Sequence, residues 1–197
     1  RRAILPSMPL LFCGYFLFVF YPLVGYITNM RRLALEKLSQ WKEQSDRLPL
    51  LVRGARQVGK TWLLREHGKS YISFVEINLE SDPEFTPLFE AYFGKPDQLL
   101  QSIELLLAKK ITVGQTLFFI DEIQQSNKAL LSLRYFKEKM PALHVVAAGS
   151  LLEFAFKDFS FPVGRIEFMH LFPMNFQEFL LARDRSDLVD AIACADE

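Results

Sequence analysis

Short apolar runs, separated by glycine, proline or charged residues, recur along this chain of 197 residues. Continuous runs of this length suit the strands of a parallel sheet, because such strands are buried on both faces of the sheet. The pattern predicts five strands, at residues 48–52, 71–79, 116–120, 143–148 and 165–171.

Between these runs, apolar residues recur every three or four positions, which is the period of an amphipathic helix. The first such stretch covers residues 30–44 and includes Leu33, Leu38 and Trp41 among its apolar positions. Further helices are predicted at residues 61–67, 86–93, 96–108, 127–140 and 175–182. Because strands alternate with helices, the chain is predicted to fold as an α/β domain built from βαβ units.

The first predicted strand runs into a loop that fits the phosphate-binding pattern G-x-x-x-x-G-K-[ST]. The loop consists of Gly54, Ala55, Arg56, Gln57, Val58, Gly59, Lys60 and Thr61. A strand that passes through such a loop into a helix directs backbone N–H groups and the positive end of the helix dipole toward one point. Lys60 can reach the β- and γ-phosphates, and the Thr61 hydroxyl can ligate Mg²⁺. The loop therefore predicts a site for a nucleotide such as ATP, together with Mg²⁺.

A pair of carboxylates forms the second half of the predicted site. Asp121 directly follows the apolar run of residues 116–120, where it can face the magnesium ion. Glu122 follows Asp121 and can orient and polarise a water molecule for attack on the γ-phosphate. Two acids at the end of a strand also occur as plain solvated residues, but the phosphate-binding loop favours a hydrolytic site.

Two further residues are candidates for the same chemistry. Ser150 follows the predicted strand at residues 143–148, and its hydroxyl can contact the γ-phosphate or the attacking water if this strand lies between the loop strand and the Asp121 strand. The alternative role of Ser150 is to cap a following helix. Arg165 can act as an arginine finger in the site of a neighbouring subunit, although a lone arginine is more often a surface cation.

Residues 3–29 are uncharged and largely apolar, and the stretch is long enough to span a membrane. A pair of arginines stands at each end of it, so the flanking charge does not fix an orientation. Residues 1–29 are therefore expected to be either an extension upstream of the working protein, whose first helix opens at Met30, or a membrane anchor. A signal peptide fits poorly, because the stretch is too long and has no evident small-residue cleavage site.

Composition and charge restrict the classes of function. Half of the residues are hydrophobic and 23% are charged, which suits a globular domain with a sizeable core. The formal net charge is zero, so the overall balance does not indicate a nucleic-acid partner. Cys13 and Cys194 show no metal-ligand spacing, which favours a reducing, cytoplasmic compartment. The three histidines stand apart from any cysteine or acid cluster and are expected to be structural: His67, His144 and His170.

In combination and order, these motifs resemble the AAA+-type ATPases of bacteria and archaea that carry a second, C-terminal domain of unknown function. The likeness covers about residues 30–181. Besides the loop, it rests on F-F-I-D-E-I-Q at 118–124, A-A-G-S-L-L at 147–152, V-G-R at 163–165, Pro173 and F-Q-E-F at 176–179. The resemblance implies a P-loop NTPase fold, with a five-stranded parallel sheet between helices and the Ser150 strand between the loop strand and the Asp121 strand. It favours Ser150 as a sensor of the γ-phosphate and Arg165 as a finger, since AAA+ proteins often place that residue just before the last core strand.

The resemblance also predicts the domain organisation and the function. Residues 30–183 are expected to form the ATPase core, and residues 184–197 the start of a truncated C-terminal region. The domain is expected to bind and hydrolyse ATP as a homo-oligomer that acts on an unidentified macromolecular partner, with residues 3–29 as a contact with the membrane if they form an anchor. The alternatives are a nucleotide-gated binding module with little or no turnover, and a small-molecule phosphotransferase, which would need an acceptor pocket and an arginine-rich lid that the sequence does not indicate.

Overall fold

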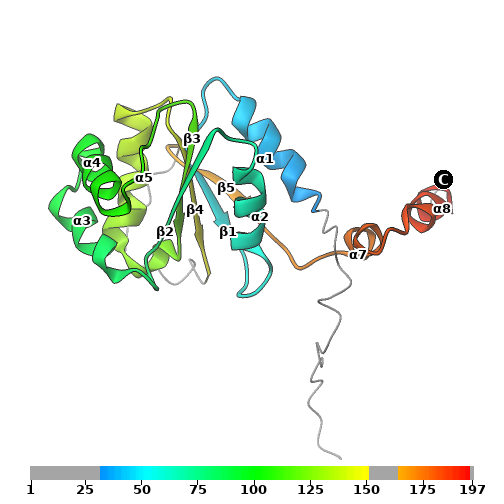
Figure 1. The fold of residues 1–197 in the computed structure, drawn as a ribbon. Coiled ribbons are helices and arrows are strands. Elements are labelled where there is room, and N and C mark those ends of the chain that lie inside the picture. Colours follow the sequence, from blue (N-terminus) through cyan, green and yellow to red (C-terminus); the bar gives the residue numbers. More distant parts are fainter. Residues whose placement is uncertain (1–31, 151–163, 196–197) are drawn as a thin grey trace, which may run out of the picture.

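A five-stranded parallel sheet forms the centre of the computed structural model, which describes residues 32–150 and 164–195 (Figure 1). The strands are β1 (Leu50–Arg53), β2 (Ser73–Asn78), β3 (Thr116–Asp121), β4 (His144–Gly149) and β5 (Glu167–His170). Their order in the sheet is β2-β3-β4-β1-β5, and every pairing is parallel. The predicted α/β fold is thus confirmed, as is the position of β4 between β1 and β3.

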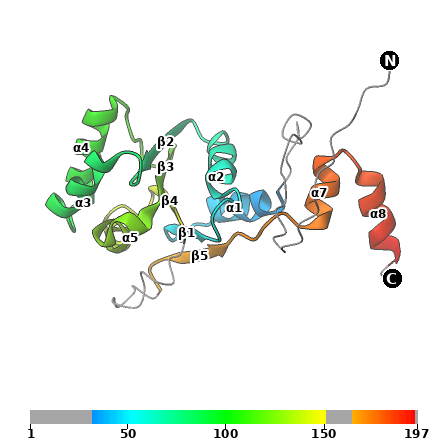
Figure 2. The same cartoon turned by 90° about the horizontal axis from the view of Figure 1, so that it is seen from below.

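Helices cover both faces of the sheet (Figures 1 and 2). One face packs against α1 (Ala34–Glu43) and α2 (Lys60–Gly68), and the other against α3 (Thr86–Ala91), α4 (Pro96–Leu107) and α5 (Asn127–Lys139). Two helices, α7 (Phe176–Ala182) and α8 (Ser186–Ala195), follow β5 and extend away from the sheet (Figure 2). Short 3-10 turns at Pro83–Phe85 and Ile123–Gln125 complete the described elements.

The sheet separates two apolar clusters. Successive side chains of a strand point to opposite faces, so β1 places Leu51 in the cluster under α3, α4 and α5, and Val52 in the cluster under α1 and α2. All six residues of β3 and all six of β4 are buried. This two-sided burial explains why the central strands are continuous apolar runs rather than alternating patterns.

Two helices begin at side-chain caps. The Ser126 hydroxyl accepts a hydrogen bond from the backbone N–H of Ala129 at the start of α5. At the start of α7, the Asn175 side chain accepts from the Glu178 N–H, and the Glu178 carboxylate accepts from the Asn175 N–H, which is a capping box. These caps satisfy N–H groups that the helices cannot pair internally.

The structure differs from the sequence-based expectations mainly at the ends of elements. The predicted strand at residues 71–79 is shorter at its start, because Ile72 lies exposed before the point where Ser73 pairs with Thr116 of β3. The helix α8 was not predicted. The apolar stretch of residues 3–29 lies outside the described residues, and within residues 32–150 and 164–195 no helix is long and apolar enough to cross a membrane.

Candidate nucleotide-binding site

The loop of residues 54–61 joins β1 to α2 at the edge of the sheet where the strands end (Figure 1). Gly59, directly before α2, has a φ of 91°, a left-handed conformation that glycine adopts without steric cost. Among the described residues, no side chain caps the first turn of α2. The N–H groups of this turn therefore remain donors for an anion, and the helix dipole favours negative charge at the same place.

Lys60 lies buried inside the loop. Its Nζ donates to the carbonyl oxygen of Gly54 at 2.9 Å and to that of Ala55 at 2.8 Å. Burial lowers the pKa of Lys60, while the carboxylates of Glu122 and Asp121 act in the opposite direction. A phosphate group that enters the loop would replace the two carbonyl oxygens as partners of this ammonium group.

Thr61 and Asp121, the two predicted magnesium ligands, are in direct contact. The Thr61 Oγ1 donates to Oδ2 of Asp121 at 2.7 Å, and the Asp121 side chain is almost fully buried, with 2% exposure. Burial raises the pKa of Asp121, and its hydrogen bonds from Thr61 and from the Glu122 N–H oppose that rise. A hydroxyl and a carboxylate side by side fit Mg²⁺, which prefers oxygen ligands and takes its remaining ligands from phosphate and water.

Glu122 follows Asp121 in a left-handed conformation, with φ of 49°, and its backbone N–H donates to Oδ1 of Asp121 at 2.9 Å. Its carboxylate accepts a hydrogen bond from Nε2 of Gln124 at 2.5 Å. The sequence did not single out Gln124 individually, although it lies within the motif at residues 118–124. The available signal was that Gln124 stands two residues after Glu122, close enough for its amide to reach the Glu122 carboxylate.

A cavity of about 340 Å³ lies over the loop. It is lined by Arg56, Gln57, Gly59, Lys60, Thr61, Trp62, Glu80 and Glu122. Most of these residues were predicted from the loop pattern or from the acid pair. Trp62 and Glu80 were not, because neither belongs to a pattern that signals phosphate or metal chemistry.

Ser150 lies at the end of β4, and β4 lies between the loop strand and the Asp121 strand. The side chain is 1% exposed, and its Oγ has no hydrogen-bond partner among the described residues. A buried hydroxyl without a partner is costly, and a phosphate oxygen or a water at this edge of the sheet could supply the missing partner. Ser150 is not among the residues that line the cavity over the loop. Its alternative role as a helix cap concerns residues that lie outside the described ranges.

Arg165 lies at the end of the sheet where the strands begin, opposite the end that carries the loop. In the parallel register, Glu167 pairs with Leu50 at the start of β1, whereas the loop follows the end of that strand. The Arg165 guanidinium is about half exposed and lies 3.9 Å from the Glu138 carboxylate. The residue therefore lies far from its own loop, and its role as a finger in a neighbouring subunit stays a prediction.

Two of the three histidines lie in an aromatic cluster rather than in the cavity. His67 and His144 are buried on either side of Tyr71, whose hydroxyl is 2.8 Å from Nδ1 of His144. Burial lowers the pKa of both histidines to about 4. Both side chains are thus neutral at physiological pH. The third, His170, accepts a hydrogen bond from Arg53 at the exposed edge formed by β5.

Residues 46–180 match the model of a protein family described as AAA domain. Among solved structures, the chain is similar to the Walker-type ATPase Paby2304 of Pyrococcus abyssi, with a TM-score of 0.51 and 21% identity over 80% of this chain and 57% of that one. It is also similar to PCH-2 of C. elegans, with a TM-score of 0.46 and 14% identity over 74% of this chain and 43% of that one. No curated protein matches it.

The similarity to the Pyrococcus ATPase concerns the fold, and the chain spans little more than half the length of that protein. The family model covers more than half of this chain, from the turn before β1 into α7, and includes the loop, Asp121 and Glu122. The chain belongs to the AAA domain family and is an AAA-type ATPase domain.

Proposed function

We propose that this domain binds ATP with Mg²⁺ at the loop of residues 54–61, hydrolyses it, and uses turnover to act on a macromolecular partner. The observation that carries the proposal is the hydrogen bond of 2.7 Å between Thr61 and Asp121. It joins the end of the loop to the end of β3, with Glu122 directly beside it. Two oxygen ligands and a candidate base therefore meet at the place where the γ-phosphate of a bound nucleotide would lie.

Each group has a role in this proposal. The N–H groups at the start of α2 and the Lys60 ammonium bind the β- and γ-phosphates, and Thr61 and Asp121 hold the metal ion. Mg²⁺ supplies positive charge that offsets the charge developing on the phosphate oxygens. The Glu122 carboxylate orients the attacking water and accepts its proton, and the Ser150 hydroxyl donates to the γ-phosphate.

Substitution of Glu122 by Gln tests the hydrolytic step. Gln keeps the size of the side chain but cannot accept the proton, so steady-state phosphate release should fall about 100-fold or more while the dissociation constant for ATP stays within about twofold. Glu80→Gln is the matched control, because Glu80 lines the same cavity without following β3. Phosphate release by the unmodified chain that is no faster than that of the Glu122 variant would remove the hydrolase proposal.

A nucleotide-gated binding module is the second candidate, and two contacts favour it. Lys60 is bonded to the carbonyl oxygens of its own loop, and Glu122 to the amide of Gln124. A domain in which ATP binding only exchanges these contacts would change shape without rapid turnover. Such a domain would bind ATP tightly, yet its phosphate release would not depend on Glu122.

The proposal includes a homo-oligomer in which Arg165 acts as the arginine finger. Because Arg165 lies at the sheet edge opposite its own loop, it can complete only the site of another subunit. The specific activity should therefore rise with protein concentration, and the slope should vanish in an Arg165→Ala variant. Charge gives no reason to propose a nucleic acid as the macromolecular partner, since the formal net charge is zero.

A further inference from the structure

Arg32, two residues before α1, is a buried arginine that contacts three distant parts of the chain. Its Nε donates to Oε1 of Glu178 at 3.1 Å, its Nη1 to the carbonyl oxygen of Val58 at 2.9 Å, and its Nη2 to that of Phe172 at 2.7 Å. The side chains of Arg32 and Glu178 are only 4% and 6% exposed. A buried ion pair is weak evidence for a gain in stability, because desolvation offsets much of the attraction. The contacts of this pair therefore point to a role other than stability.

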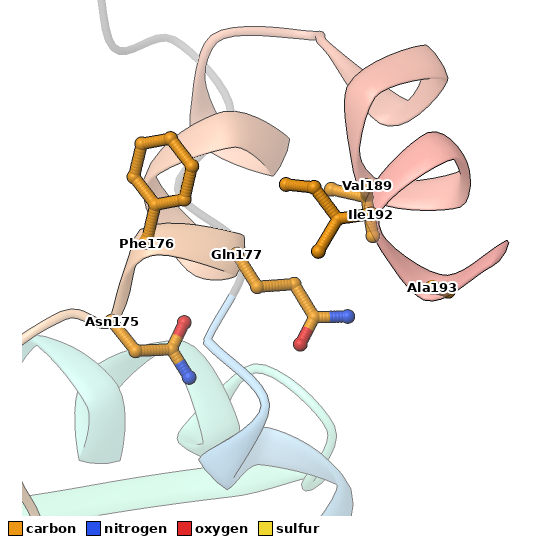
Figure 3. Close-up of a pocket in the computed structure, with 6 residues that line it drawn as sticks. All are labelled: Asn175, Phe176, Gln177, Val189, Ile192 and Ala193. Carbon is orange, nitrogen blue, oxygen red and sulfur yellow. The ribbon is translucent and has the colours of Figure 1, made fainter. Parts of the chain in front are cut away.

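The Glu178 end of the pair belongs to α7. One carboxylate oxygen of Glu178 accepts from the Asn175 N–H within the capping box, and the other accepts from both Arg32 and the Leu33 N–H, at 2.9 Å for the latter. The first turn of α7 is thus fixed to the residues that precede α1. Asn175 also lines a hollow of about 430 Å³ between α7 and α8, where Phe176 and Gln177 face Val189 and Ile192 (Figure 3). A movement of this turn would therefore change the hollow as well.

Arg32 also lies close to the second half of the phosphate-binding loop. Val58 precedes Gly59, and a Cβ added to Gly59 would lie 3.5 Å from Nη1 of Arg32. At the other end of the loop, a Cβ added to Gly54 would lie 2.2 Å from the carbonyl oxygen of Leu171. The first end of the phosphate-binding loop therefore lies against the segment that joins β5 to α7, and the second end contacts Arg32, which donates to Phe172 of that segment.

Phosphate binding has to change this loop. Lys60 Nζ is bonded to the carbonyl oxygens of Gly54 and Ala55, and it must leave them to reach a phosphate. A phosphate bound by the N–H groups of this loop would also contact the backbone around Val58 and Gly59, and coupling through Arg32 requires that the Val58 carbonyl shift when the phosphate binds. Because one guanidinium bonds this carbonyl, that of Phe172 and the Glu178 carboxylate, a shift of the Val58 carbonyl would act directly on the contacts that hold α7.

We propose that Arg32 is a positioning residue that couples phosphate occupancy of the loop to the position of α7, and through α7 to α8. The inference rests on the proposed function, since it needs a nucleotide in the loop. Coupling of this kind is reciprocal, so whatever moves α7 changes the affinity for nucleotide by the same factor. The arrangement gives the ATPase domain a built-in path by which its nucleotide state reaches the helices that extend from the sheet.

Amide hydrogen exchange of the full chain, with and without saturating Mg·ADP, tests the coupling, and the ADP dissociation constant is measured on the same samples. In the unmodified chain, ADP should change the exchange rates of α7 amides by about fivefold or more, the lower end of typical allosteric coupling. In Glu178→Gln, which keeps the size of the side chain but leaves Arg32 without a counter-charge, the change should fall below about twofold. Glu66→Gln is the matched control, because it neutralises an exposed ion pair with Lys69, and it should keep the full change.

A second variant keeps the test decisive if Glu178→Gln unfolds. Arg32→Lys keeps a positive charge beside Glu178 but removes the planar fork that reaches both Val58 and Phe172, and it should lose the ADP-dependent change while the β3 amides stay protected. If Arg32 and Glu178 were purely structural, each substitution would change the exchange rates of the α7 amides by the same factor with and without ADP. Full ADP-dependent changes in both folded variants, or none in an unmodified chain that binds ADP, would overturn the coupling alone. An unmodified chain that binds no ADP would overturn the proposed function and the coupling together.

Discussion

Replacement of Asp121 by Asn should have opposite effects on stability with and without Mg²⁺ and nucleotide. The Asp121 carboxylate is 2% exposed, and its pKa is raised by burial even though Thr61 and the Glu122 N–H donate to it. A raised pKa means that the folded protein disfavours the charged carboxylate relative to the unfolded chain, at about 1.4 kcal/mol per pKa unit. Asn has the same shape and no charge, so it removes this cost.

Without ligand, the Asn variant should therefore have a higher free energy of unfolding at pH 7 and a higher melting temperature than the unmodified chain. With Mg·ADP at about 100 times its dissociation constant, the unmodified chain should gain about 2.7 kcal/mol. The Asn variant should gain less than about 1 kcal/mol at the same concentration, because it lacks the charged magnesium ligand. The order of the two stabilities should therefore reverse when ligand is added.

Thermal unfolding followed by circular dichroism, first in EDTA and then in Mg·ADP, measures both effects. Asp46→Asn is the matched control, because Asp46 is 93% exposed in an ion pair with Lys137, and its removal should leave the ligand-dependent gain unchanged. An Asp121→Asn variant that melts below the unmodified chain in EDTA would refute the electrostatic reasoning. Equal gains from Mg·ADP in both proteins would refute the assignment of Asp121 as a metal ligand.

Two further predictions concern the histidine cluster and the first residue of the loop. Burial lowers the pKa of His67 and His144 to about 4, so only the unfolded chain takes up these protons as the pH falls below 6.5. The contribution of these two neutral histidines to the free energy of unfolding is therefore kept above pH 6.5 and lost as the pH falls, by about 2 kcal/mol for each histidine at pH 5. Urea denaturation at pH 7.5 and at pH 5 measures this loss. Equal denaturation midpoints at the two pH values would contradict it. Gly54→Ala would place a Cβ 2.2 Å from the Leu171 carbonyl, so ADP affinity should fall about tenfold or more in a fluorescence titration. Gly114→Ala, whose Cβ meets nothing within 4 Å, should keep the affinity even though the φ of 77° at Gly114 strains an alanine and lowers the stability. Equal affinities in the two variants would contradict the packing argument.

The fold was predictable because the central strands are buried on both faces. Every residue of β3 and β4 is buried, so a continuous apolar run sufficed to locate each strand. Strand ends were harder, because they depend on pairing: β2 begins only where Ser73 meets Thr116, although the preceding Ile72 also suits a strand. The helix α8 was not predicted, although Leu188 and Ile192 stand four positions apart, as on one face of a helix.

The contact between Thr61 and Asp121 could also be anticipated, since the carboxyl ends of parallel strands meet at one edge of a sheet. The pair of Arg32 and Glu178 could not, because the two residues lie 146 positions apart and Arg32 belongs to no motif, although Glu178 lies within the motif at residues 176–179. The same limit applies to Glu80, whose presence in the cavity follows from tertiary packing, whereas Trp62 directly follows the loop in the sequence. The loop and the acid pair can be recognised from sequence motifs, whereas the contacts that connect the loop to α7 form only when the chain folds.

Calorimetric titration of the chain with ATP, in Mg²⁺ and in EDTA, tests the central claim most directly. The account predicts one site per chain that binds more tightly by about tenfold or more in Mg²⁺, because Thr61 and Asp121 would hold the ion and its charge would offset that of the phosphates. It also predicts that Lys60→Ala abolishes the binding under both conditions, because the ammonium group that contacts the phosphates is lost. Binding that is unaffected by Mg²⁺ and by the loss of Lys60 would contradict a nucleotide site at this loop.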